Sequence, residues 1–209
     1  ISHEHSDHIA GLQQLLKRFD IPVYTKQGTW REIQDKLFLP KNQLIELTKG
    51  SLTLGNLIVE PFAVSHDAAD PIGINVFSGK DKATVVTDTG IISDDILHRI
   101  DDSTLLVLEA NYDPHMLRFG PYQPFLKQRV ASDEGHLSNE MAAQALLMMK
   151  RPDFMQVILA HRSENNNNAV LVTQTIGKML VDGGVRIGSE MKLQHGQPNE
   201  IVSMQSIKR

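Results

Sequence analysis

The stretch Ser2–His8, "SHEHSDH", places three of the chain's nine histidines and an aspartate close together near its start. Imidazoles repel one another once protonated and gain little from burial, so such a cluster is costly unless a cation lies among its members. His3 and His5 are two residues apart and point the same way on an extended loop. Asp7 and His8 then reach a second position nearby. The stretch therefore predicts a site for two metal ions.

Composition sets broad limits on the protein. The chain has 209 residues, a net charge of −4 and 41% hydrophobic residues, as expected of one domain over residues 1–209. The absence of a basic excess means that a nucleic acid would have to be held by a local site or by metal ions. No run approaches the roughly 18 apolar residues of a membrane span, so no membrane partner is expected. The sequence does not indicate an oligomeric state.

The chain contains no cysteine, which limits both compartment and ligand chemistry. The lack of disulfides fits a reducing compartment, so we expect a cytoplasmic protein. Imidazole and carboxylate remain as the strong metal ligands.

Hydrophobic periodicity predicts an α/β protein, with short strands in the middle and helices toward both ends. Helices are expected over residues 7–19, 29–38, 93–100, 123–131, 139–150 and 169–181. Strands are expected over residues 21–24, 44–47, 52–54, 57–64, 73–78, 83–88, 104–110 and 154–161, with a hairpin around 185–195. Such a pattern is typical of helices that cover packed sheets.

Three further ligand-type residues each follow an apolar run. His66 comes after "EPFAVS", Asp88 after "ATVVT" and His161 after "FMQVILA". Strand ends are where α/β architectures place their sites. Together with the first cluster they make five histidines and two aspartates, a set suited to two zinc ions, with manganese or iron as alternatives.

In this order the residues resemble the signature of the metallo-β-lactamase-fold hydrolases, His-x-His-x-Asp-His followed by a separate His, an Asp and a final His. The resemblance implies an αββα sandwich of two mixed sheets with helices outside. It also implies that one metal is held by three histidines, the other by an aspartate and two histidines, and that an aspartate bridges both. The first set is His3, His5 and His66, the second is Asp7, His8 and His161, and the bridge is Asp88.

Two positions exclude other branches of that superfamily. The β-lactamases that use a thiolate ligand place cysteine where this chain has Asp88. Flavodiiron relatives place glutamate where it has His5. Antibiotic hydrolysis and oxygen reduction are therefore not expected.

Four segments, "VSHDA" (64–68), "TDTG" (87–90), "SDEGHLSNE" (132–140) and "AHRSENN" (160–166), resemble the bacterial YycJ/WalJ group, which is associated with exonuclease activity. The chain is also similar to ribonuclease Z, in which a glutamate and a histidine form an acid relay. That likeness makes Asp7, Glu109 and His136 the candidate catalytic residues. It implies a phosphodiester hydrolase acting on DNA or RNA, in which two metals lower the pKa of a bridging water, His136 protonates the leaving oxygen and the helix after Ser138 holds a terminal phosphate.

Two other functions stay open at this stage. One is a small-molecule hydrolase of the glyoxalase II type, acting on a thioester or a cyclic phosphodiester. The other is a metal-binding partner module that has lost turnover. The stretch 116–129, "MLRFGPYQPFLKQR", combines basic and aromatic residues that suit either nucleic-acid contact or the docking of an amphipathic segment. His98, His115 and His195 fit no pattern and are expected at the surface.

One feature of the resemblance has no counterpart in this chain. The family's opening strands, with an aspartate that supports the metal site, do not precede Ile1. Either the domain is incomplete at its N-terminus and lacks these strands, or another segment supplies them. A sheet edge without them would expose unpaired backbone groups and invite pairing with another chain.

Overall fold

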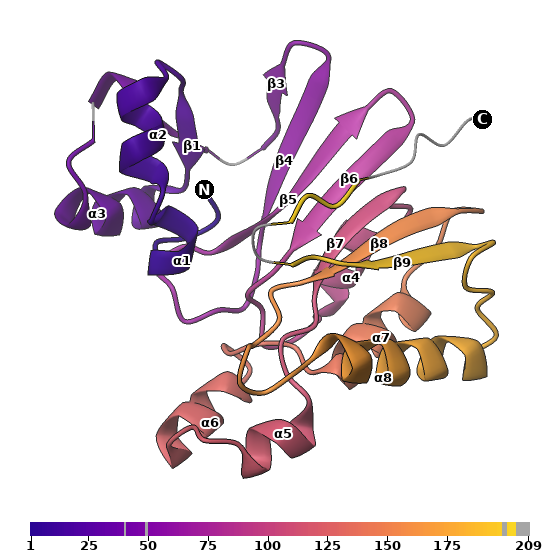
Figure 1. Ribbon diagram of the computed structural model, residues 1–209. Coiled ribbons are helices and arrows are strands. Elements are labelled where there is room, and N and C mark those ends of the chain that lie inside the picture. Colours follow the sequence, from indigo (N-terminus) through magenta and orange to yellow (C-terminus); the bar gives the residue numbers. More distant parts are fainter. Residues whose placement is uncertain (40, 49, 198–199, 204–209) are drawn as a thin grey trace.

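A seven-stranded mixed sheet forms the centre of the structure (Figure 1). This computed structural model describes residues 1–39, 41–48, 50–197 and 200–203. The strands lie side by side in chain order: β3 (Leu52–Leu54), β4 (Leu57–Ala63), β5 (Ile72–Ser78), β6 (Asp81–Val86), β7 (Leu105–Glu109), β8 (Met155–Ala160) and β9 (Met191–His195).

The sheet changes from antiparallel to parallel at β6. Strands β3 to β6 pair antiparallel, with a loop over residues 64–71 between β4 and β5, whereas β6 to β9 pair parallel. Parallel neighbours need long crossover connections. The helices in these connections are α4 (Asp94–Ile100), α5 (Pro114–Phe119), α6 (Pro124–Val130), α7 (Asn139–Met148) and α8 (Ala169–Asp182).

The C-terminal hairpin predicted around residues 185–195 is wrong. A single strand, β9, forms there, and it pairs parallel with β8 in a register that sets Met191 beside Met155. Helix α8 lies between the two strands in the chain and forms a crossover connection. A crossover brings β9 beside β8 in the parallel direction, whereas a hairpin would pair it with an antiparallel strand. Ile187 makes only an isolated bridge with Met191.

The two faces of the sheet differ in burial. Leu106, Val157 and Leu193 lie across from one another on the face that packs against the helices, where Ala142, Leu146 and Ile176 join them in the main core. Side chains on the other face, such as Val85 at 39% exposure, are more accessible. Strand alternation therefore places the fully buried residues on the helix side.

The N-terminal residues form a small subdomain with a core of its own. Its elements are α1 (Ser6–Ile9), α2 (Leu12–Arg18), β1 (Val23–Thr25), α3 (Gln27–Lys36), the short 3₁₀ helix η1 (Lys41–Gln43) and β2 (Leu44–Glu46). Strands β1 and β2 pair parallel, and Ile9, Leu16, Trp30 and Ile33 pack together beneath them.

The single helix predicted over residues 7–19 is divided into α1 and α2. Ala10 ends the first helix, and Gly11 caps the second without a side-chain hydrogen bond. Glycine lowers helix stability, and the break lets α1 take its own direction beside the strand ends.

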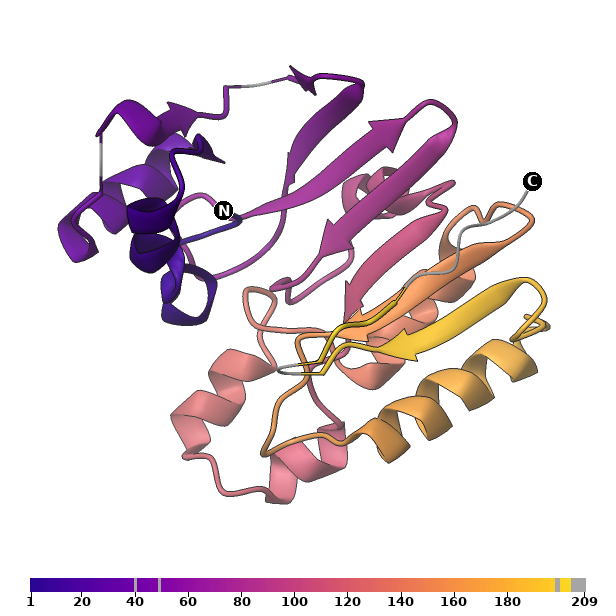
Figure 2. The same ribbon diagram turned by 45° about the horizontal axis from the view of Figure 1, so that its top comes forward.

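The α/β class is confirmed, with a difference in the sheets. The described residues form one mixed sheet and the parallel pair β1–β2, whereas two mixed sheets were expected. The turned view shows the N-terminal subdomain and the α5–α6 pair on either side of one end of the sheet (Figure 2). None of the helices among the described residues is long and apolar enough to span a membrane.

Candidate metal centre

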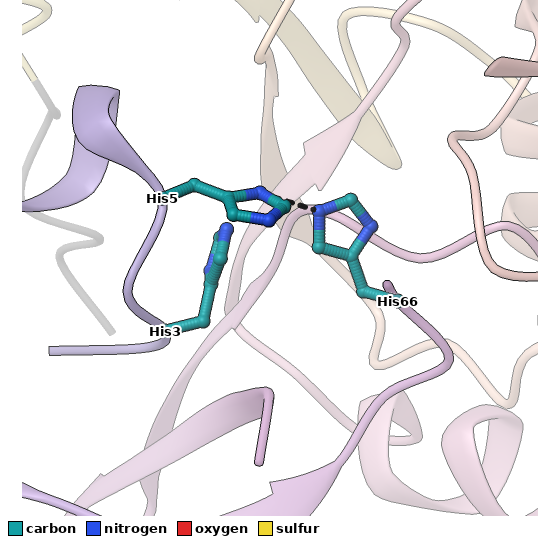
Figure 3. Close-up of side chains that lie close together, drawn as sticks. All are labelled: His3, His5 and His66. Carbon is teal, nitrogen blue, oxygen red and sulfur yellow. Dashed lines mark hydrogen bonds between the residues drawn. The ribbon is translucent and has the colours of Figure 1, made fainter. Parts of the chain in front are cut away.

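The first ligand group consists of three histidines from two loops. His3 and His5 lie on the segment before α1, and His66 lies in the loop after β4 (Figure 3). One ring nitrogen of each lies within 4.8 Å of the others, and His66 Nε2 is 3.2 Å from His5 Nδ1. His66 Nδ1 faces the carbonyl oxygen of Gly135 at 3.1 Å, which leaves Nε2 directed at the other two rings.

The second ligand group lies beside the first. Asp7 and His8 belong to α1, and His161 follows β8 directly. His161 Nε2 is 3.4 Å from Asp7 Oδ2, and His8 Nε2 is 3.5 Å from the same oxygen. Ser2 Oγ lies within 3.2 Å of Nδ1 of both His3 and His8, so one hydroxyl fixes a ring in each group.

Asp88 lies between the two groups and touches both. Its Oδ2 is 3.3 Å from His8 Nε2, and its Oδ1 is 3.3 Å from His161 Nε2 and 3.7 Å from His66 Nε2. Its side chain is buried, so both oxygens face the cluster. The geometry matches the bridging position that the resemblance implied.

Two of these residues have a strained backbone. Asp88 has φ +60° and lies two residues after the end of β6, and His161 has φ +51° and directly follows β8. Left-handed conformations are uncommon for residues other than glycine and are concentrated at functional sites. The strain turns both side chains out of the strand direction and into the cluster.

Glu109, the last residue of β7, is fully buried and holds two histidines at once. Its Oε1 lies 2.7 Å from His136 Nδ1 and 2.8 Å from His161 Nδ1. Its Oε2 accepts hydrogen bonds from the backbone N–H groups of Thr89 and Leu137. A carboxylate in this position fixes the tautomer and the orientation of both rings.

The pKa directions follow from burial and charge. Burial, aided by the charge of His8, lowers the pKa of His3 to about 3. Burial also opposes protonation of His161, but hydrogen bonds with Asp7 and Glu109 outweigh it and raise that pKa to about 10. Burial works to raise the pKa of Asp88, yet the hydrogen bond from His8 and the charge of His161 hold it well below its usual range.

The cluster fits divalent metal ions. His3 Nε2 is buried and has no hydrogen-bond partner, and an unpaired buried nitrogen of this kind is costly. Every donor is an imidazole nitrogen or a carboxylate oxygen, the chemistry that zinc, manganese and iron accept. Carboxylates that contact several imidazole rings also favour a cation among them.

A family model described as "Beta-lactamase superfamily domain" matches residues 1–161, which include every residue of this cluster. The chain belongs to this family. Family membership implies divalent metal binding. Exodeoxyribonuclease YycJ of Bacillus anthracis is 34% identical over 209 residues, which are 99% of this chain and 79% of that protein. Exodeoxyribonuclease WalJ of Streptococcus pneumoniae serotype 2 is 32% identical over 212 residues, 99% of this chain and 78% of that protein.

Solved structures of the same fold confirm the architecture. The metallo-β-lactamase fold protein YhfI of Bacillus subtilis superposes with a TM-score of 0.65 at 16% identity, over 94% of this chain and 73% of that one. The short form of human tRNase Z gives a TM-score of 0.54 at 21% identity, over 78% of this chain and 71% of that one.

Sequence reasoning missed several residues around the centre. Asp67 lies next to His66, approaches His5 at 3.9 Å and forms an ion pair with Arg129. Glu4, between two histidines in the sequence, accepts a hydrogen bond from the backbone N–H of Ala69. Each of these contacts joins segments that are far apart in the chain, so spacing in the sequence could not reveal it. The one signal in the sequence was the carboxylate of Glu4, which lies inside the histidine motif.

Only part of the stretch 116–129 lies beside the candidate metal centre. Tyr122 and Arg129 line the cavity beside the cluster. Phe119 and Phe125 are exposed at 67% and 70% and are not among the residues that line this cavity. Lys127 donates a hydrogen bond to the carbonyl oxygen of Arg118, within the α5–α6 pair.

Two smaller predictions need correction. The N–H groups of Asn139 and Met141 are bonded to Tyr112 O and Ser138 Oγ, so the phosphate site predicted at the start of α7 lacks these donors. His195, expected at the surface, is half-buried, and its Nε2 lies 2.8 Å from Oγ1 of Thr173 in α8. His98 and His115 are exposed, as expected.

Proposed function

We propose that the protein is a metal-dependent phosphodiester hydrolase that degrades DNA from an end. The observation that carries the proposal is the pair of ligand groups joined by Asp88 and placed beside the Glu109–His136 pair. The two exodeoxyribonucleases at 32–34% identity support DNA as the substrate. The absence of cysteine fits a reducing compartment, and we place the activity in the cytoplasm.

The geometry supports a specific set of proposed metal ligands. His3, His5 and His66 would hold one ion, Asp7, His8 and His161 would hold a second, and Asp88 would bridge them. Zinc suits this set best, with manganese or iron as alternatives. Two divalent ions in such a site supply an activated water and stabilise the charge on the attacked phosphoryl group.

His136 is proposed as the general acid. Its Nδ1 is held by Glu109, so Nε2 is the nitrogen that carries a proton toward the leaving oxygen. The ring lies between the first ligand group and His161, with centroids 5.1 Å from His66 and 5.3 Å from His161. An alkoxide leaves poorly unless it is protonated, so this position suits phosphodiester cleavage.

Asp7 is proposed as the third catalytic residue. Its side chain is 62% exposed, whereas that of Asp88 is 3% exposed. It lines both cavities that border the cluster. Its carboxylate is therefore the one best placed to orient an attacking water and hold its proton.

The test uses end-labelled linear DNA and RNA and circular single-stranded DNA, with protein loaded with zinc or with manganese. The proposal predicts stepwise shortening of linear DNA and no cutting of the circle. Protein stripped with a chelator is the control and should be inactive. Cutting of the circle would show an endonuclease, and hydrolysis of a glutathione thioester without any DNA cleavage would favour the glyoxalase II type of reaction.

A further inference from the structure

A cavity of about 710 Å³ borders the metal centre beside His161. Its walls come from the α5–α6 pair, the loop after β8 and the segment after β9. Pockets of this size hold small organic ligands, so it has room for one nucleotide unit. The charged, imidazole and tyrosine side chains in its lining are those of Asp7, Tyr122, Arg129, His136, His161, Arg162 and Glu164.

Arg162 carries a charge that has no ion-pair partner among the residues that the structure describes. It directly follows His161, it is half-buried, and its Nη1 nitrogen is buried without a hydrogen-bond partner. Among the described residues it forms no ion pair. Burial, and then the charge of Arg162, lower the pKa of His195, which fits a guanidinium whose charge is not neutralised.

The second arginine of the cavity is different. Arg129 forms an ion pair with Asp67 across from the first ligand group, so its charge is already matched. A partly buried guanidinium without a counter-ion is unfavourable, and an anionic ligand would remove that cost. Of the two arginines, Arg162 is therefore the one that lacks an anion.

A second cavity, of about 650 Å³, also borders the centre, and its lining includes Glu4, His5 and Asp88. Asp7, Arg129, His136 and His161 line both cavities. A chain whose scissile phosphodiester lies at the metal centre would therefore extend into the first cavity on one side and the second on the other. The phosphate next to the scissile one in that nucleic-acid chain would then enter the first cavity, which Arg162 lines.

We infer that Arg162 binds the phosphate that neighbours the scissile phosphodiester, with the ring of Tyr122 beside the base of that nucleotide. The inference rests on the proposed phosphodiesterase function. A guanidinium suits a phosphate because its planar N–H groups bind two oxygens at once. Tyrosine rings stack on bases without regard to sequence. Arg162 thereby becomes a substrate-positioning residue and not a metal ligand.

The test combines Arg162→Ala with chemically neutralised phosphates. A short DNA is made with a neutral methylphosphonate in place of the phosphate on one side or the other of the scissile bond. Arg162→Ala should lower kcat/KM on unmodified DNA by about 10- to 100-fold, the range for losing a charge-assisted hydrogen bond. On one of the two modified DNAs the variant should cause no further loss, because its partner is already gone. Bis(p-nitrophenyl) phosphate, which has no neighbouring phosphate, should be cleaved at the wild-type rate.

Controls separate binding from structure. Arg162→Lys keeps the charge but not the planar pair of donors, and should give an intermediate loss. Arg186→Ala removes an exposed arginine that pairs with Glu190 and should change nothing. Metal content and melting temperature of each variant are measured alongside.

The possible results separate a failure of the Arg162 inference from a failure of the nuclease function. Equal losses on DNA and on bis(p-nitrophenyl) phosphate, or additive losses on both methylphosphonate DNAs, would overturn the inference while leaving the nuclease function intact. Wild-type protein that cleaves no DNA with any metal would instead remove the function and the inference with it. If Arg162→Ala fails to fold, the same comparison is made with Arg162→Lys.

Discussion

Glu109 and His136 are joined by a 2.7 Å contact between Oε1 and Nδ1, and the same oxygen lies 2.8 Å from Nδ1 of His161. One buried carboxylate thus orients both the proposed acid and a proposed metal ligand. Substitutions of Glu109 and of His136 are therefore expected to differ in what they remove.

Glu109→Gln should impair metal binding as well as turnover. The amide keeps the size of the side chain but loses the negative charge that supports two imidazoles. Metal affinity and kcat should each fall by about 10- to 100-fold, the usual effect of removing such a supporting carboxylate. Titration with zinc and a chelating competitor measures the first, and unchanged metal affinity would show that Glu109 does not support His161.

Asp88→Asn should lose most of the bound metal. The substitution preserves shape and tolerates the positive φ of +60°, so the fold should survive. Elemental analysis should find more than one metal ion per wild-type chain and a small fraction of that in the variant. Full occupancy in the variant would contradict the bridging role.

Metal binding should release protons at neutral pH. In the metal-free protein burial opposes protonation of His161, but its hydrogen bonds to Asp7 and Glu109 keep the pKa at about 10. The raised pKa means that the ring is protonated at neutral pH, and a metal ion must displace that proton. Affinity should therefore rise with pH, by up to about tenfold per unit for one proton. Calorimetry in two buffers of different ionisation enthalpy counts the protons, and a count of zero would refute this.

Two glycine substitutions should have opposite effects on stability. A Cβ at Gly90 would lie 2.3 Å from backbone atoms of Ser132 and Asp133, in the loop that precedes His136. Gly90→Ala should therefore cost about 1–3 kcal/mol and displace that loop. A Cβ added at Gly177, inside α8, would meet open space, because the nearest atom outside the helix is Cδ1 of Ile187 at 4.0 Å. Gly177→Ala should stabilise by up to about 1 kcal/mol. Urea unfolding of both variants checks the pair, and a stable, fully active Gly90→Ala variant would show that the two loops can separate freely.

The grouping of the candidate ligands was predictable because it depends on local spacing and on strand ends. His3 and His5 share a loop, while Asp88 and His161 each follow an apolar run. These features can be recognised in the sequence without knowledge of the fold. The contact between Glu109 and His161 was not predictable, because it depends on β7 lying parallel to β8 in a register that sets Glu109 beside Ala160.

Tertiary constraints also decided the predictions that were wrong. The helix expected over residues 7–19 has one apolar face, but its first turn carries Asp7 and His8 toward the cluster, and the chain breaks at Gly11. Strand β9 lies in the stretch 185–195, which was expected to form a hairpin. The crossover through α8 instead delivers it parallel to β8.

The most direct test of the proposed function compares His136→Ala with wild type on three substrates: DNA, a nitrophenyl phosphodiester and a glutathione thioester. Losing a positioned acid should lower the rate on DNA by about 10²–10⁴-fold, while the activated nitrophenyl ester, whose leaving group needs no proton, should lose little. Metal content should equal that of wild type. Equal losses on DNA and on the nitrophenyl ester, or efficient turnover of the thioester alone, would contradict a phosphodiesterase in which His136 protonates the leaving oxygen.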